Sequence, residues 1–350
     1  MVTSKAHVRP EKRAANGFGR RQFLLTMGVF AAGALAGPLS RRAQAAVNLG
    51  MQAFTQSGLA LGTQTSMTVL HRDAQVAQQA ARAAMRELED IDALMSLYRE
   101  QSQVCVLNRT GRLDDADPRL LEVLKEAQAM SLRTDGAFDI TVQPLWRTFA
   151  SAKAVGRLPD ETEVQAARGM VDWRKLEIVG ARVTVGTGMS ITLNGIAQGY
   201  AADRTMAVLR RHGIEHALVN AGELAAIGRN AEGKPWTVGI QHPRNKDAFV
   251  AVASLDGRCM ATSGDYATTF TADFMNHHIF DPATGHSPQS LMSASVVCSS
   301  ACLADALSTA IFVLGPERGL ALVESIPGAD LLLVRRDGQQ IATKGFPVAS

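Results

Sequence analysis

Apolar residues recur at helical spacing in a long stretch at positions 74–96. One face of this stretch carries Ala80, Ala84, Leu88, Ile91 and Met95. This periodicity predicts an amphipathic helix that packs one side against a core. We expect another helix to begin at Asp117-Pro118 and run to about 134, and a short one at 160–170.

Short apolar runs bounded by turn residues predict strands elsewhere in the chain. The expected strands are 61–70, 176–179, 182–185, 190–193, 217–220, 236–241, 249–255 and 329–335. Residues 46–62 suggest an irregular lead-in, and 135–146 a surface loop with a buried phenylalanine. Because helical and strand segments mix without strict alternation, the predicted fold class is α+β.

In the apolar stretch 302–318, the first half is expected to form a helix that ends near Gly315-Pro316, and residues 319–325 are expected to be helical again. Asp305 and Thr309 are four residues apart, so they project from one face of one turn. A carboxylate among apolar neighbours needs a partner, because an unpaired buried charge is costly. The partner could be a hard cation with oxygen ligands. Alternatively, Asp305 caps the helix or forms a salt bridge, and Thr309 bonds to the carbonyl four residues earlier.

Two loops concentrate polar residues and glycine. At 193–203 a glycine-containing turn leads into a helix that ends at Gly213, and amides at such a helix N-terminus can bind anions. At 276–285, histidine, aspartate and threonine crowd around a Pro-Gly turn, and loops of this kind often carry function.

Charge is distributed unevenly along the 350 residues. The formal net charge is +3, but residues 1–45 hold eight basic residues and one acidic residue. The remaining 28 basic and 32 acidic residues leave a net charge near −4. This balance gives no electrostatic footprint for nucleic acid.

The N-terminus has the features of an export signal. A twin-arginine pattern at 19–25 and an apolar run at 23–39 precede a small-x-small cleavage site at 43–45. We therefore expect a twin-arginine signal peptide at 1–45, a mature domain at 46–350 beginning at Ala46, and a periplasmic location. An uncleaved membrane anchor is the alternative, although the run is marginal in length for a span.

The four cysteines do not form a metal-binding signature. Cys298 and Cys302 have the spacing of a possible pair, but buried free thiols are the main expectation for Cys105, Cys259, Cys298 and Cys302.

Seven short segments together resemble the FAD:protein FMN transferase (ApbE-like) family. They are Met-Ser-Leu-Tyr at 95–98 with Ser102 and Asn108, Gly-Ala-Phe-Asp at 136–139, Gly-Ile-Ala-Gln-Gly-Tyr at 195–200, Val-Asn-Ala-Gly at 219–222, Ala-Thr-Ser-Gly-Asp-Tyr at 261–266, His-Ile-Phe-Asp-Pro-Ala-Thr-Gly at 278–285, and Ala-Asp-Ala-Leu-Ser-Thr-Ala at 304–310. Each is weak alone, but all seven occur in the order typical of the family, between about 61 and 318.

The resemblance implies an α+β, T-fold-related structure, with mixed helices and largely antiparallel sheets around an FAD cleft. It also implies a Mg²⁺-dependent enzyme that transfers FMN from FAD to a Ser/Thr hydroxyl of a partner protein and releases AMP. Such chemistry needs a divalent cation for phosphate charge, a base for the hydroxyl proton and a rigid cleft.

The resemblance also assigns site residues. It implies that Asp305, Thr309 and the carbonyl of Gly195 bind Mg²⁺. His278 is the candidate general base, since an imidazole transfers protons near neutrality; otherwise it only hydrogen-bonds its turn. The positions implied for FAD are Leu61, Tyr98, Ala137, Phe138, Asp139, Thr192, Gln198 and Phe280. For Phe138, simple core packing is the alternative.

Three positions depart from the pattern typical of the family. Thr192 replaces a common aspartate, and Gln198 a common lysine or glutamate, so charge is lost near the implied flavin. Ala221-Gly222-Glu223 is one glycine short. The short form and the export signal resemble the NosX-like branch tied to nitrous-oxide reductase maturation, whose acceptor would be a membrane flavoprotein with a periplasmic domain.

Two other functions remain open at the level of sequence. One is a Mg²⁺-dependent FAD pyrophosphatase that gives FMN and AMP, which differs only in the nucleophile. The other is a periplasmic flavin-binding protein without turnover.

Overall fold

A computed structural model of the chain describes residues 50–349. The expected twin-arginine pattern, apolar run and cleavage site lie outside the described residues. The helices are α3 (Ala74–Met95), α4 (Gln103–Thr110), α5 (Pro118–Arg133), α6 (Gln143–Ala154), α7 (Glu161–Arg168), α8 (Ala197–Arg211) and α9 (Ala301–Glu324), with short 3₁₀ turns η1 (Ile140–Val142) and η2 (Trp173–Lys175).

The strands form three antiparallel sheets within residues 50–349. The large sheet has the order β1 (Gln52–Ala60), β2 (Thr63–His71), β6 (His216–Asn220), β7 (Leu224–Ile227), β10 (Cys259–Gly264), β11 (Leu291–Cys298), β12 (Asp330–Arg335), β13 (Gln340–Ala342). The small sheets are β3 (Arg112–Leu113) with β5 (Arg182–Thr184) and β4 (Glu177–Val179), and β8 (Trp236–His242) with β9 (Asn245–Leu255). The α+β class with largely antiparallel sheets is therefore confirmed.

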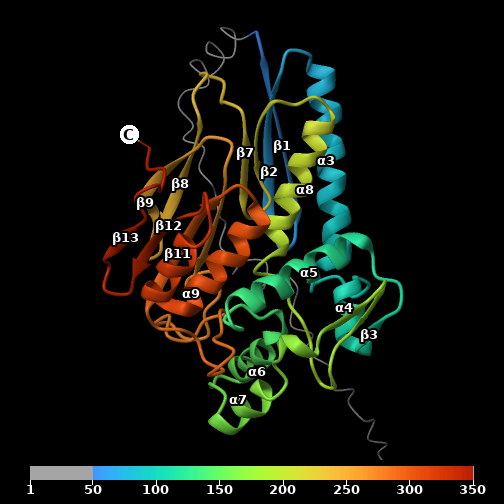
Figure 1. Ribbon diagram of the computed structural model, residues 1–350, viewed down its shortest axis with the longest axis vertical. Helices are drawn as coiled ribbons and strands as arrows, with labels where there is room; N and C mark the ends of the chain where they lie inside the picture. The colour runs from blue at the N-terminus through green and yellow to red at the C-terminus, as the bar shows by residue number, and fades with distance from the viewer. Residues whose placement is uncertain (1–49, 350) are drawn as a thin grey trace, which may run out of the picture.

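Both faces of the large sheet are covered. Helices α3, α8 and α9 pack on one face, where the main apolar core lies. The β8–β9 ribbon contributes Trp236 and Val238 to a second apolar cluster on the opposite face. Helices α4 to α7 form a lobe beyond one end of the sheet (Figure 1), and α6 and α7 contribute to a third cluster around Phe149.

The predicted helices begin where their capping residues stand. Asp73 caps α3, Asp117 caps α5 and Asp160 caps α7, each by accepting hydrogen bonds from amides of the first turn. In α9 the backbone leaves helical geometry at Gly315, where φ is 78°. This break confirms the expected interruption before the helix resumes.

Several expectations about strands and loops were wrong. Part of the expected irregular lead-in is the edge strand β1, and α6 begins inside the expected loop at 135–146. Residues 190–193 form no strand and join no sheet. Instead, the side-chain amide of Asn108 donates to the carbonyl of Ile191 at 2.8 Å and accepts from its amide at 2.6 Å. A side chain thus replaces a neighbouring strand.

Helix α9 has the length and hydropathy of a membrane span, with a mean hydropathy of 1.4. Its residues Leu307, Ile311 and Phe312 are fully buried in the main core. The core helix of a globular domain passes the same test, so this feature carries no membrane assignment.

The four cysteines are unpaired, as expected, and Cys259, Cys298 and Cys302 are buried. Cys298 lies opposite Cys259 across the β10–β11 ladder. Burial raises the pKa of the Cys298 thiol to about 11, so this thiol stays protonated at neutral pH.

Candidate active site

Two adjoining cavities of about 180 Å³ each lie where the helical lobe meets the ends of the sheet strands. We call them the Leu61 cavity and the Asp305 cavity. Leu61 lines only the first cavity, and Asp305 lines only the second. They share the lining residues Tyr98, Asn194, Gln198, Glu223, Thr262, Ala267, Thr268 and His278. Because the lining is shared, the two form one elongated site.

The structure brings all twelve sequence-predicted site residues to this site. Leu61 lines the Leu61 cavity. The Asp305 cavity is lined by Tyr98, Ala137, Phe138, Asp139, Thr192, Gly195, Gln198, His278, Phe280, Asp305 and Thr309. Segments more than 200 residues apart in sequence therefore converge on one cleft.

The Leu61 turn is held in an uncommon backbone conformation. Leu61 has φ of 50° and Gly62 φ of 75°, in the two-residue turn between β1 and β2. The amide of Leu61 donates to the buried carboxylate of Asp92 at 2.9 Å, and Asp92 also pairs with Arg99 at 2.6 Å. Backbone strain of this kind concentrates at functional sites. Sequence reasoning missed Asp92 because its contact with the Leu61 turn joins residues that are distant in sequence.

Asp139 lines the Asp305 cavity and also stabilises its own loop through hydrogen bonds. Its carboxylate accepts from the amide and hydroxyl of Thr141, both at 2.7 Å, and from the amide of Trp173 at 3.1 Å. Burial raises its pKa, although these hydrogen bonds act in the opposite direction. Asp139 therefore fixes the loop, and the neighbouring Phe138 packs in the main core while also lining the cavity.

Asp305 is buried without a cationic partner. It is 3% exposed, and its Oδ2 accepts a hydrogen bond from the amide of Gly199 at 3.0 Å. Among residues 50–349 no salt bridge includes Asp305. Burial raises its pKa to about 7, against the effect of the Gly199 hydrogen bond. The salt-bridge alternative for Asp305 thus finds no support in the described part of the chain.

Thr309 faces the same space as Asp305. Its hydroxyl lies 3.0 Å from the hydroxyl of Ser263 in β10. The backbone of Gly195 packs against it, since a Cβ at Gly195 would come within 2.9 Å of the Thr309 Oγ1. A carboxylate, a hydroxyl and a main-chain segment therefore meet at one end of the Asp305 cavity.

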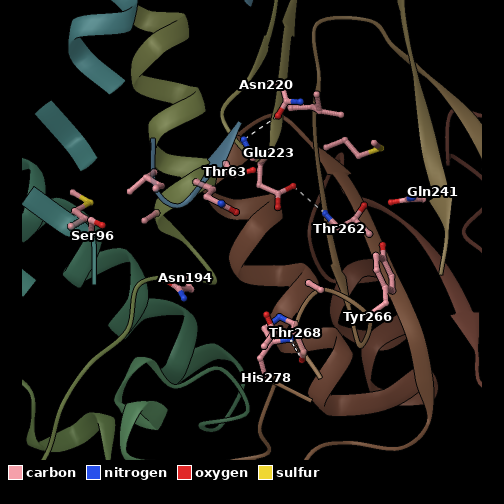
Figure 2. A pocket seen from close by; sticks show the side chains of 18 of the residues that line it. Thr63, Ser96, Asn194, Asn220, Glu223, Gln241, Thr262, Tyr266, Thr268 and His278 are labelled. Atoms are coloured by element: carbon pink, nitrogen blue, oxygen red, sulfur yellow. Dashed lines mark hydrogen bonds between the residues drawn. The ribbon is translucent and has the colours of Figure 1, made fainter. Parts of the chain in front are cut away.

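Glu223 is a site residue for which the sequence analysis predicted no role. It projects into the cleft beside β10, and its carboxylate accepts from the amide of Thr262 at 3.1 Å (Figure 2). Burial and the nearby negative charge of Asp305 raise its pKa well above the usual range. An acidic residue directly after the Ala-Gly turn was the available signal, but sequence alone does not show that it faces Asp305.

Replacement of Glu223 by glutamine is expected to stabilise the metal-free protein at about pH 8 by roughly 1–3 kcal/mol. Because the folded state holds the Glu223 proton more tightly than the unfolded state, its contribution to stability is present at acidic pH and lost as pH rises above about 4.5. Glutamine cannot ionise. Chemical denaturation at about pH 5 and pH 8 measures the difference, and an equal advantage at both pH values would contradict this explanation.

His278 stands where both cavities meet. Its Nδ1 lies 3.1 Å from the carbonyl of Thr268 (Figure 2). A carbonyl can only accept, so the proton is on Nδ1, and Nε2 keeps its lone pair. Burial lowers the pKa of His278 to about 4, so the imidazole is neutral at physiological pH. His278 therefore makes the expected turn hydrogen bond and keeps a basic nitrogen as well.

The site is lined by carboxyl groups but by no basic cation. Asp139, Glu223 and Asp305 are its acidic residues, and neither cavity is lined by a lysine or arginine. Within residues 50–349, no three side chains drawn from His, Cys, Asp and Glu gather to hold a metal. Asp305 with oxygens of Thr309 and Gly195 remains a donor set of the kind that hard cations prefer. These residues therefore fit a Mg²⁺ ion.

A buried aspartate beside the cleft pairs with two partly exposed arginines. Asp265 is fully buried and pairs with Arg244, at 2.7 and 2.6 Å, and with Arg336 at 3.1 Å. The next residue, Tyr266, lines the Leu61 cavity. Sequence reasoning noted the motif but could not find the two arginines, which come from separate turns.

Comparison with known proteins shows the family of this chain. The model of the ApbE family matches residues 61–333. The FAD:protein FMN transferase of Vibrio cholerae is 31% identical over 265 residues, which cover 72% of this chain and 78% of that protein. The crystal structure of the ApbE protein from Thermotoga maritima has a TM-score of 0.76 at 30% identity, covering 84% of this chain and 97% of that one.

A second solved structure, the apo form of the flavinyl transferase ApbE from Pseudomonas stutzeri, has a TM-score of 0.73 at 30% identity. It covers 84% of this chain and 95% of that chain. The match to the family model spans most of the sequence and includes every residue of the site described above. The chain therefore belongs to the ApbE family.

Proposed function

We propose that this protein is an FAD:protein FMN transferase that moves FMN from FAD to a Ser/Thr hydroxyl of an acceptor protein and releases AMP, with Mg²⁺ as cofactor. The names of its relatives support the general reaction. The observation that carries the metal requirement is the acidic cleft. A pyrophosphate is anionic, and a site lined by carboxylates without a basic side chain needs a cation to receive it.

Different residues of the cleft have different roles in the proposed reaction. Asp305, Thr309 and the carbonyl of Gly195 would hold Mg²⁺, and the bound ion would neutralise charge on the phosphates. The acceptor hydroxyl oxygen forms a bond to the phosphorus of the FMN half, and the P–O bond to AMP breaks. His278 Nε2 accepts the hydroxyl proton. The side chains of Tyr98, Phe138 and Phe280 supply apolar surface for the flavin nucleotide.

Two neutral residues distinguish this cleft. Thr192 lines the Asp305 cavity, and its hydroxyl accepts from the amide of Asn194 at 3.2 Å. Gln198 packs against Gly222, where a Cβ would lie 2.5 Å from the carboxamide carbon. Because neither carries a charge, we propose that they bind the nucleotide through hydrogen bonds and shape.

The sequence also supports a proposal for the acceptor and for the location. The signal expected at 1–45 supports export by the twin-arginine pathway to the periplasm. The single glycine at Gly222 and this signal support an acceptor of the NosX-like type, a membrane flavoprotein of nitrous-oxide respiration with a periplasmic domain.

The test uses the protein from Ala46 with FAD and Mg²⁺, with and without a periplasmic flavoprotein domain that carries a Ser/Thr acceptor motif. An acceptor that gains the mass of FMN less one water, together with free AMP, supports the transferase. FMN and AMP with an unmodified acceptor would replace it by the pyrophosphatase. Retained FAD without turnover would leave a binding protein.

A further inference from the structure

Helix α8 presents a stripe of three residues to helix α9. Gly195, Gly199 and Asp203 are spaced by four residues, so they lie along one side of α8 and the turn before it. Gly195 packs against Thr309, Gly199 against Ala301 and Asp305, and Asp203 against the start of α9. The stripe therefore contacts the helix that carries both side chains of the proposed metal site.

Asp203 caps α9 from outside that helix. Its carboxylate accepts hydrogen bonds from the Ser300 hydroxyl at 2.7 Å, the Ala301 amide at 2.9 Å and the Cys302 amide at 3.0 Å. The first amides of a helix have no partner within the helix, and negative charge is favourable there. Helix α9 also has a cap of its own, because the Ser300 hydroxyl accepts from the Leu303 amide at 3.2 Å. Asp203 is thus a second cap, which ties α9 to α8.

Gly199 extends the same connection into the site. Its amide is the hydrogen-bond donor to Asp305 Oδ2, and there is no room for a side chain between the helices. A Cβ on Gly199 would overlap the carbonyl of Ala301 and lie 2.8 Å from the Asp305 Cβ. The distance between α8 and α9 therefore determines where the Asp305 carboxylate stands relative to Gly195.

We propose that Asp203 is a positioning residue for the metal site, which holds α9 against α8 so that Asp305 and Thr309 face Gly195 at the spacing the cation needs. This inference rests on the proposed function. Mg²⁺ requires near-ideal octahedral geometry with ligands at about 2.0–2.1 Å, so a small movement of α9 weakens binding. Asp203 lines neither cavity and acts only through α9.

The experiment compares Asp203→Asn with Asp73→Asn. Asp73 is a matched control because its carboxylate also caps a helix, α3, by accepting from the amides of Gln75 at 2.7 Å and Val76 at 3.3 Å. Mn²⁺ is the probe, since it takes the same oxygen ligands as Mg²⁺. Its dissociation constant is measured from the paramagnetic resonance signal of the free ion, with FAD present, and Mg²⁺ competition follows.

We expect both variants to melt at lower temperature than the wild type, but only Asp203→Asn to weaken Mn²⁺ binding, by roughly 10- to 100-fold. Equal Mn²⁺ affinity in the two variants and the wild type would make Asp203 a purely structural cap and overturn the inference, while the metal site would stand. A wild type that binds no Mn²⁺ would overturn the metal site itself.

Asp203→Asn could also fail to fold, since it disturbs three hydrogen bonds with α9 and a weak one from the Cys259 thiol. Ser300→Ala then gives a second comparison. It removes the hydroxyl donor to Asp203, together with the helix's own cap at Leu303, and leaves the Asp203 carboxylate in place. We expect a weaker loss of Mn²⁺ affinity in this variant, in the same direction. Unchanged affinity in a folded Ser300→Ala would count against the inference.

Discussion

Replacement of Asp305 by asparagine is expected to lower Mg²⁺-dependent turnover by roughly 10³-fold or more, because it removes the charged ligand of the proposed metal site. The neutral amide is nearly the same size, so the fold of α9 should persist. Initial rates of AMP release at several Mg²⁺ concentrations measure the effect. The variant should also lose the increase in melting temperature that Mg²⁺ gives the wild type.

The same substitution is expected to stabilise the metal-free protein at about pH 8. Because burial raises the folded-state pKa of Asp305 to about 7, the folded state holds a proton that the unfolded state releases at lower pH. Stability is therefore lost as pH rises from about 4 to 7, and asparagine avoids this loss. We expect a gain of a few kcal/mol at most, or several degrees in melting temperature.

Asp265 provides the contrasting control. It is as deeply buried as Asp305, but two arginines neutralise it. Asp265→Asn leaves these arginines without their carboxylate, so we expect a loss of roughly 3–5 kcal/mol in stability. If Asp305→Asn destabilised the metal-free protein to the same extent, Asp305 would have a structural partner, and the metal site would lose its main support.

The sequence predicted those helices whose ends carry a local signal. The capping aspartates Asp73, Asp117 and Asp160 and the apolar stripe of α3 lie within a few residues of the boundaries they set. Helix α6 was missed because its first residues, Gln143 and Pro144, continue a stretch of turn residues without a break in composition.

Strands were harder to predict, because their patterns depend on what covers each face. Edge strand β1 turns Gln56 and Gly58 toward the protein, so its apolar alternation is interrupted. Every residue of strand β11 is buried. Helix α9 covers one face of this strand, and the apolar cluster that includes the β8–β9 ribbon covers the other face. Such a strand has no alternation to detect. Apolar alternation therefore does not predict the strand at the edge of the sheet or the fully buried strand inside it.

The motifs predicted which loops come together more completely than the apolar pattern predicted the sheet, because the motifs identify loops directly. All twelve expected residues line the two cavities, and Leu61 also contributes through its backbone conformation, with φ of 50°. Glu223, Asp92 and the pairing of Arg244 with Asp265 could not be predicted. Each depends on a contact between segments that only the folded chain brings together.

Replacement of His278 by alanine is expected to lower the turnover number by roughly 10²- to 10⁴-fold, the usual contribution of a general base. FAD binding should change little, because the site keeps its other lining residues. With the wild type at saturating Mg²⁺, burial of His278 moves the acid limb of the rate profile to about pH 4. Activity should therefore stay nearly constant from about pH 6 to 8, in contrast to a solvent-exposed histidine with a pKa near 6.5.

The adjacent residue, His277, provides a control that distinguishes a role in proton transfer from a role in stability. His277 is fully buried, packs edge-on against Phe312 at 5.4 Å and hydrogen-bonds the carbonyl of Pro288 at 3.1 Å, but it lines neither cavity. His277→Gln should therefore lower the melting temperature more than the turnover number, and His278→Ala the reverse. Added imidazole should restore part of the activity of His278→Ala alone, because only that variant lacks the base. A folded His278→Ala whose turnover number stays within about tenfold of the wild type would show that another group accepts the hydroxyl proton. The group to test next would then be Glu223, whose carboxylate lines both cavities.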